Sequence, residues 1–177
     1  MPYSTTDHAG NLAQLGRDVR HYRNGSEQFC AFAFDLDQLR RLEPAVTSRY
    51  DKEDCLTTDG TWLASFWSTS KPQHTERAVL AVFDQWYSDY QSTYGAPNTL
   101  YIYSFLIPCL RDGGHGHCSD AIASQLLTLK KRGIDLTVYM GWSNDDRDLD
   151  MAQAIKTSVM DLEDDLLDVH IRKVSIA

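Results

Sequence analysis

A chain of 177 residues, with 42% hydrophobic and 11% aromatic side chains, has the length of one domain and enough apolar surface for its own core. Its formal charge of −8 at pH 7 weighs against broad, non-specific binding of nucleic acid, but it does not exclude a small basic groove. No apolar run approaches the roughly 18 residues of a membrane span, and the polar first residues do not form a secretory signal. We therefore expect one soluble, intracellular domain over residues 1–177, with no membrane segment.

Helical and strand-like patterns alternate along the first part of the chain. The apolar spacing predicts a helix over residues 7–22, and aromatic residues in alternation predict a strand over residues 29–36. Residues 37–59 are polar and mixed, which indicates a long connection with a short helix before Pro44. The strand predicted over residues 61–68 can pair antiparallel with the first strand through that connection.

The second part of the chain alternates helices and strands more regularly. The predicted elements are a helix over 74–90, a strand over 99–107, a helix that begins at Cys118, a strand over 134–142, a helix over 143–161 and a strand over 166–176. Helical crossovers between successive strands favour a parallel sheet in this part, covered by helices on both faces. We interpret the basic cluster at 130–132 as the end of the helix that Cys118 begins, where positive charge suits the helix dipole.

The four cysteines do not require a disulfide framework in a chain of this length. Cys30 lies within a predicted strand, where a small buried thiol is the simplest interpretation. Cys55 lies in the long connection, and we interpret it as a free or half-buried thiol. Cys109 and Cys118 stand at more informative places, because each borders a predicted helix or strand.

Three metal-binding side chains stand next to predicted helix starts. His74 opens one helix, Cys109 follows Pro108 after a strand, and Cys118 opens the next helix. One histidine and two cysteines suit a catalytic zinc, which takes three protein ligands and keeps a fourth position for water. Glu76, two residues after His74, is placed to move protons to and from such a water. A purely structural zinc site would have no use for this carboxylate.

Two features of the loop between the cysteines leave the ligand set partly open. His115 and His117 lie in this loop, and either is an alternative third ligand. We place them near the pocket instead, because Cys118 stands where the helix begins. A cysteine thiolate at the start of a helix faces the positive end of the dipole, which favours its deprotonated form.

These motifs resemble those of the zinc-dependent cytidine deaminase superfamily, in particular the branch of polynucleotide cytidine deaminases and tRNA adenosine deaminases. The resemblance rests on His74-Thr75-Glu76 and on Pro108-Cys109 followed by Cys118, and it covers nearly the whole chain. It implies an α/β fold with three α-β-α layers and a five-stranded mixed sheet of order 2-1-3-4-5, in which strands 4 and 5 are parallel. It also implies a Zn²⁺ ion held by His74, Cys109 and Cys118, with Glu76 as the catalytic proton shuttle. The chain departs from the usual spacing, because eight residues separate the two cysteines instead of two or a few.

The substrate is less well defined than the chemistry. A helix between the fourth and fifth strands, and Trp142 at a position where the resembling enzymes stack a flanking nucleotide, favour a single-stranded polynucleotide. Trp142 has a core-edge position as its alternative, whereas Trp67 is a second aromatic candidate for which core packing is the favoured interpretation. Acidic residues around Asp145 and Asp146 count against phosphate binding. The remaining candidates for substrate contact are polar or basic residues near the motifs, namely Ser70, Arg111, His115 and His117, with Lys71 and Arg77 as further positive groups.

We therefore expect a hydrolase that converts cytosine to uracil, with single-stranded DNA or RNA as its partner. A free cytidine nucleoside or nucleotide, or adenine, is the alternative substrate for the same chemistry. A non-catalytic binding protein stabilised by zinc is the alternative of another class.

Overall fold

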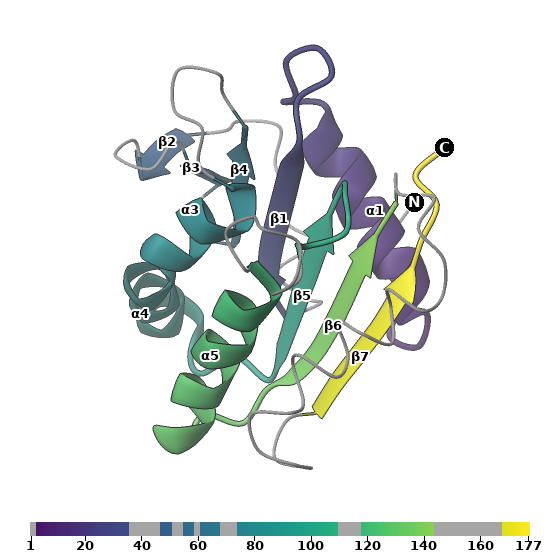
Figure 1. Ribbon diagram of the computed structural model, residues 1–177. Coiled ribbons are helices and arrows are strands. Elements are labelled where there is room, and N and C mark those ends of the chain that lie inside the picture. Colours follow the sequence, from purple (N-terminus) through teal and green to yellow (C-terminus); the bar gives the residue numbers. More distant parts are fainter. Residues whose placement is uncertain are drawn as a thin grey trace.

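The computed structural model of the chain describes residues 3–35, 47–50 (backbone only), 55–58, 61–67, 74–109, 118–143 and 168–177 (Figure 1). The helices are α1 (His8–Arg20), α3 (Thr75–Ala81), α4 (Phe83–Tyr94) and α5 (Cys118–Lys131). The strands are β1 (Phe29–Phe34), β2 (Thr47–Tyr50), β3 (Cys55–Thr58), β4 (Trp62–Phe66), β5 (Thr99–Ser104), β6 (Thr137–Trp142) and β7 (Asp168–Lys173).

All the described strands belong to one open, mixed sheet of order β2-β3-β4-β1-β5-β6-β7. β1 is antiparallel to both of its neighbours, β4 and β5, whereas β5, β6 and β7 run parallel to one another. The α/β class, the mixed sheet and the parallel last two strands were predicted and are confirmed. The expected antiparallel pairing of the first two predicted strands is also confirmed, as the pairing of β1 with β4.

The prediction of five strands in the order 2-1-3-4-5 was wrong for the sheet as a whole. The predicted strands follow one another as β4-β1-β5-β6-β7, but β2 and β3 extend the sheet beyond β4. Both lie in residues 37–59, which were predicted to form a connection. β3 pairs with β4 along its whole length, and Cys55 and Thr57 are buried there. Backbone pairing at the sheet edge therefore forms a strand from residues that show no apolar alternation.

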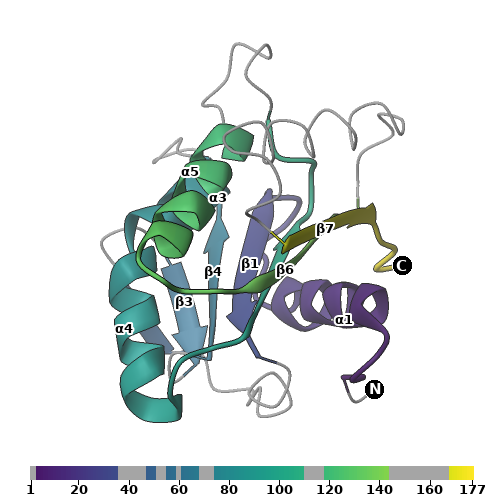
Figure 2. The same ribbon diagram turned by 90° about the horizontal axis from the view of Figure 1, so that it is seen from below.

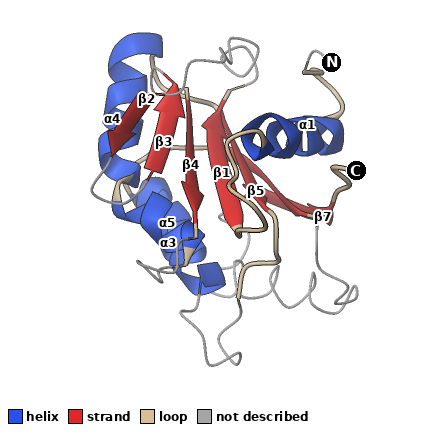
Figure 3. Cartoon of the chain, turned by 90° about the horizontal axis from the view of Figure 1, so that it is seen from above, coloured by secondary structure: helices blue, strands red, loops and turns tan. Residues whose placement is uncertain are grey.

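Helices cover both faces of the sheet, which gives three layers (Figures 2 and 3). α1 packs on one face with a core that includes Leu12, Leu15 and Tyr103. α3, α4 and α5 pack on the other face with a larger core that includes Trp86, Ile122 and the β-strand residues between them. Alternate residues of each strand point to opposite faces of the sheet, so the two faces present different side chains.

Several predicted boundaries differ from the structure. The helix predicted over 74–90 is two helices, α3 and α4, separated at Val82 (φ −113°, ψ 6°). The strand predicted over 99–107 ends at Ser104, because the Leu106 N–H donates to Gln28 Oε1 (3.0 Å) instead of continuing the backbone ladder. The short helix before Pro44 and the helix predicted over 143–161 lie outside the described residues, apart from Ser143.

Helices long and apolar enough to cross a membrane are absent from the part of the chain that the structure describes.

Candidate metal centre and its cavity

The structure brings His74, Cys109 and Cys118 together, although Cys109 lies 35 positions and Cys118 lies 44 positions after the histidine in sequence. The His74 Nδ1 atom lies 3.5 Å from Cys109 Sγ and 3.2 Å from Cys118 Sγ. The three ligand atoms lie within 4.8 Å of one another, near enough to hold one metal ion. The sequence prediction that these three side chains share a site is confirmed at this level.

The spacing of the three atoms suits a tetrahedral metal ion. Zinc–sulfur bonds of about 2.3 Å and zinc–nitrogen bonds of about 2.0 Å at tetrahedral angles separate the nitrogen and sulfur atoms by about 3.6 Å. The two nitrogen–sulfur distances here lie close to that value. A donor set of one imidazole and two thiols is typical of zinc rather than of magnesium or calcium, which prefer oxygen ligands. The residues present therefore fit a zinc ion.

The start of α5 positions both cysteines. The Cys118 backbone N–H donates to Cys109 Sγ (3.2 Å), and the Ser119 backbone N–H donates to the Cys109 carbonyl oxygen (3.1 Å). The buried Ser119 hydroxyl also donates to the Pro108 carbonyl oxygen (3.2 Å). These bonds use N–H groups that a helix start leaves without intrahelical partners. The segment after β5 is thereby fixed against α5, with the Cys109 sulfur directed at the site.

The start of α3 supplies the third ligand and the acid. His74 is the N-cap of α3, in extended conformation (φ −62°, ψ 133°), and Glu76 lies in the first turn. Glu76 is 3% exposed, and two hydroxyl groups hold its carboxylate. Ser104 Oγ donates to Glu76 Oε1 (2.7 Å), and Thr75 Oγ1 donates to Glu76 Oε2 (3.1 Å). Buried carboxylates need such partners, because an unpartnered one costs several kcal/mol.

A cavity of about 390 Å³ lies against the cluster, between the residue before β1, the residue after β4, the start of α3 and the segment after β5. His74, Glu76 and Cys109 line one part of it. Gln28, Trp67, Leu106 and Ile107 line the rest, together with Thr75. The volume lies within the range of small-molecule sites, and the mixture of apolar walls with a few polar groups is typical of them.

Burial shapes the chemistry of the second cysteine. Burial, followed by the charges of Glu76 and Cys109, raises the pKa of the Cys118 thiol above its ordinary value. This direction is opposite to the one that a helix start alone predicts. A bound divalent cation would reverse it, because a metal ion deprotonates a coordinating thiol. Burial also raises the pKa of Cys30, a core thiol beside Thr75.

The structure places the two tryptophans that were proposed to contact substrate differently from the prediction. Trp67, for which core packing was the favoured interpretation, is 37% exposed and lines the cavity. Trp142 is 2% exposed and belongs to the core between the sheet and the helices α3 to α5, so the core-edge alternative describes it better than stacking. Its indole Nε1 has no hydrogen-bond partner among the described residues. The other proposed contacts, Ser70, Arg111, His115 and His117, lie outside the described residues.

Sequence analysis did not identify two residues that support the acid. Ser104 holds Glu76, and Gln28 Nε2 in turn donates to Ser104 Oγ (3.1 Å). Ser104 had a signal, because it is a polar residue on the inward face of an apolar strand. Gln28 had none, since it contacts the site only after β1 and β5 have paired.

Comparison with protein-family models, with curated proteins and with solved structures finds no match for this chain. The class of the molecule therefore rests on the α/β fold and on the His-Cys-Cys site.

Proposed function

We propose that this chain is a zinc-dependent hydrolytic deaminase that converts cytosine to uracil, with a single-stranded polynucleotide as its substrate. The observation that carries the proposal is Glu76, a buried carboxylate held by two hydroxyl groups at the wall of a cavity, next to a His-Cys-Cys cluster. A structural metal site does not need a carboxylate of this kind. The resemblance of the His74 and Cys109 motifs to those of cytidine deaminases supports the same chemistry.

The zinc ion would be held by His74 Nδ1, Cys109 Sγ and Cys118 Sγ, and it would lower the pKa of a coordinated water toward about 7. Glu76 has the position to take a proton from the attacking water and to pass protons to N3 of the base and to its amino group. The C4 carbon gains an oxygen atom and loses the amino group, so that cytosine and water become uracil and ammonia. Ser104 and Thr75 keep the carboxylate oriented while the protons move.

A second cavity supports a polynucleotide rather than a free nucleotide. It has a volume of about 690 Å³, and Arg20, Phe105, Ser143 and Lys173 line it. Phe105 lines this cavity and the next residue, Leu106, lines the metal cavity. Arg23 lies over the Phe105 ring at 4.2 Å from its centroid. A strand whose target base enters the metal cavity would thus find aromatic and positive groups nearby for its neighbouring nucleotide.

A substrate panel tests the proposal. The zinc-loaded protein is incubated with single-stranded DNA, duplex DNA, single-stranded RNA, cytidine and deoxycytidine monophosphate, and uracil is measured by mass spectrometry. We expect uracil in a single-stranded substrate. Activity on free cytidine alone would contradict the polynucleotide substrate, and zinc binding without any uracil would support a non-catalytic zinc protein. Inosine formed from adenosine in a parallel reaction would identify adenine as the base.

The basic cavity has its own test. The double variant Arg20→Ala/Lys173→Ala should raise KM for a single strand about tenfold, since two phosphate contacts are lost. Activity on any free nucleotide should not change. Lys131→Ala is the control, because it removes a positive charge from an exposed position at the end of α5. An equal loss in this control would contradict the role of the basic cavity.

A further inference from the structure

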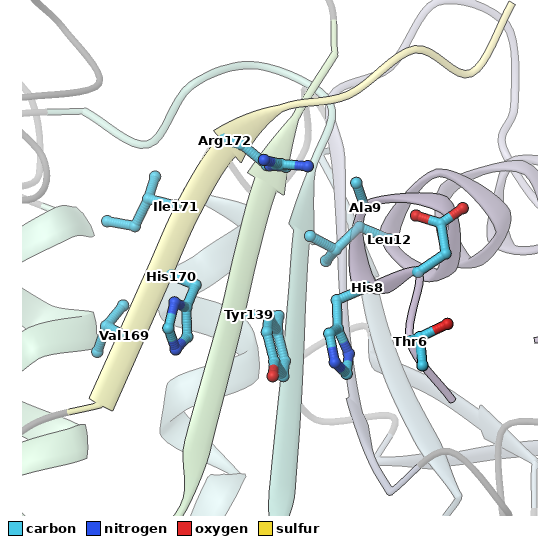
Figure 4. A pocket seen from close by; sticks show the side chains of 10 residues that line it. Thr6, His8, Ala9, Leu12, Tyr139, Val169, His170, Ile171 and Arg172 are labelled. Atoms are coloured by element: carbon cyan, nitrogen blue, oxygen red, sulfur yellow. The ribbon is translucent and has the colours of Figure 1, made fainter. Parts of the chain in front are cut away.

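Three rings form a row on the α1 face of the sheet, away from the metal cavity. His8 at the start of α1 stacks on Tyr139 of β6, with centroids 3.8 Å apart and planes at 8°. Tyr139 in turn stacks on His170 of β7, with centroids 5.1 Å apart and planes at 20°. Figure 4 shows these rings side by side above β6 and β7. Residues from three distant parts of the chain thus build one continuous stack.

Hydrogen bonds fix the His8 end of the row, and the His170 end on β7 is exposed. His8 Nδ1 is hydrogen-bonded to the Tyr101 hydroxyl (2.9 Å), which also accepts from Asn11 Nδ2 (3.1 Å). His170 Nε2 lies 2.8 Å from Asp168 Oδ1, and its side chain is 58% exposed. The stack is therefore ordered before any ligand arrives, and its outermost ring faces solvent.

Two polar groups beside the row have no partner among the described residues. The Tyr139 hydroxyl makes no hydrogen bond to them, although it carries both a donor and an acceptor. The exposed Arg172 side chain, two residues after His170 on the same face of β7, makes no ion pair with them.

These groups surround a cavity of about 390 Å³ between the start of α1 and β7. Thr6, Asp7, His8 and Leu12 line it from the α1 side, and Tyr139, His170 and Arg172 line it from the sheet (Figure 4). The Asp7 carboxylate is engaged by the backbone N–H of Gly10, which donates to its Oδ1 (2.8 Å). Val169 and Ile171 also line the cavity at the edge strand β7, and both pack against the core on the other face of the sheet. The cavity and the metal cavity share no lining residue.

We propose that this cavity binds a nucleoside monophosphate, a small anion that carries a planar base. The base continues the stack against His170, and the Arg172 guanidinium pairs with the phosphate, to which it can donate two hydrogen bonds. The Tyr139 hydroxyl supplies a polar contact to the base or the sugar. The site is independent of the proposed deaminase activity, because none of its residues lines the metal cavity.

Titration with adenosine monophosphate tests the proposal. Binding is followed by calorimetry and by the NMR signals of the histidine rings, with adenosine and inorganic phosphate as separate probes. We expect adenosine monophosphate to bind more tightly than either probe and to shift the His8 and His170 signals. His170→Ala and Arg172→Ala should each weaken binding about tenfold. Both side chains are exposed, so neither change should affect folding.

Two matched controls make the result specific. His21→Ala removes an exposed histidine at the end of α1, and Lys131→Ala removes an exposed positive charge at the end of α5. Both should bind like the parent, and so should Cys118→Ser, which changes the metal site alone. Equal affinity in the parent and in His170→Ala would overturn the proposal. Binding that is lost in Cys118→Ser would also overturn it, because the nucleotide would then occupy the metal cavity.

Discussion

Glu76 is the residue on which the proposed chemistry depends, and its neighbours hold its carboxylate in one place. It is 3% exposed, and the hydroxyl groups of Ser104 and Thr75 each donate to one of its oxygen atoms. Gln28 donates to Ser104, so a chain of hydrogen bonds runs from the cavity wall to the carboxylate. Ordered networks of this kind fix a side chain in one orientation. We infer that Ser104 and Gln28 are positioning residues for Glu76.

Ser104→Ala tests that role, because it removes one hydroxyl group that donates a hydrogen bond to Glu76. A hydrogen bond to a charged group contributes about 1.5–3 kcal/mol, so we expect kcat to fall about tenfold to a hundredfold. KM and zinc content should remain close to those of the parent, because Ser104 is neither a metal ligand nor among the residues that line the metal cavity. Steady-state kinetics and metal analysis measure these quantities.

Ser65→Ala is the control for this change, because Ser65 is a buried serine of β4 whose hydroxyl is not bonded to Glu76. It should leave kcat within twofold of the parent value. A loss of zinc in Ser104→Ala, or an equal fall of kcat in both variants, would contradict a positioning role.

At the residue scale, the ligands were predictable and their supports were not. His74, Cys109 and Cys118 were found because zinc chemistry restricts both the residue types and their places at helix starts. The ring row of His8, Tyr139 and His170 left no sequence signal, since its members come from three distant segments. Trp142 was assigned to substrate through the resemblance to the deaminases, whereas strand alternation directs it into the core.

Among the elements, α1 packs unusually close to the sheet, and glycine makes this possible. A Cβ atom at Gly16 would lie 2.6 Å from Tyr103 Cζ. A Cβ atom at Gly141 of β6 would lie 3.1 Å from the Arg172 carbonyl oxygen and 3.2 Å from Leu12 Cδ1. Ring and backbone atoms at such distances cannot move aside easily. The α1 layer therefore depends on the absence of side chains at these two positions.

Gly16→Ala should destabilise the protein although alanine favours helices. Alanine gains about 1 kcal/mol in helix propensity, but overpacking against the Tyr103 ring costs about 1–3 kcal/mol. We expect a net loss of up to about 2 kcal/mol in the free energy of unfolding, measured by urea denaturation. Ser88→Ala, at an exposed position of α4, should be neutral or slightly stabilising. A Gly16→Ala variant more stable than the parent would contradict the close packing of α1.

The same interface predicts a loss of stability in alkali. Burial raises the pKa of Tyr103 from 10.0 to about 12, and its hydroxyl is hydrogen-bonded to Ser143. Between pH 10 and pH 12 the unfolded chain loses the Tyr103 proton while the folded chain keeps it, so stability falls as the pH rises. The contribution of this residue is about 2–3 kcal/mol.

Urea denaturation at pH 9 and at pH 11 measures this loss. Tyr103→Phe should lose less stability between the two values than the parent, because the titrating group is absent. An identical loss in the parent and the variant would show that Tyr103 does not contribute.

Element boundaries show where pattern reasoning fails and why. The apolar run over residues 100–107 predicts one long strand, but its last part leaves the ladder and lines the metal cavity. Residues 47–58 have no alternating pattern. β3 forms because the edge of β4 offers unpaired backbone groups, and β2 pairs in turn with β3. The starts of α3 and α5 were predicted well, since strong apolar spacing follows each of them, but the division of the first predicted helix at Val82 was not.

For the whole molecule, the cluster joins three segments that the sheet alone does not hold together. These are the start of α3, the segment after β5 and the start of α5. A metal ion that binds only the folded chain stabilises it by an amount that grows with the metal concentration. Removal of zinc by a chelator should therefore lower the melting temperature, by about 10 °C when free zinc was about 1,000 times Kd.

Metal analysis should accordingly find about one zinc ion per chain, and less in Cys109→Ser and Cys118→Ser. Cys55→Ala is the control, because Cys55 is a buried cysteine outside the cluster, and it should keep its zinc. A full complement of zinc in Cys118→Ser would contradict the assignment of this ligand.

The most direct test of the central claim compares the parent with Glu76→Gln. Glutamine has the shape of glutamate but cannot carry the protons of the reaction, and it should preserve the fold and the zinc content. Both proteins are loaded with zinc, and uracil formed in a cytosine-containing single strand is measured by mass spectrometry. We predict uracil from the parent and none above background from Glu76→Gln. Equal rates of uracil formation by the two proteins would contradict the account.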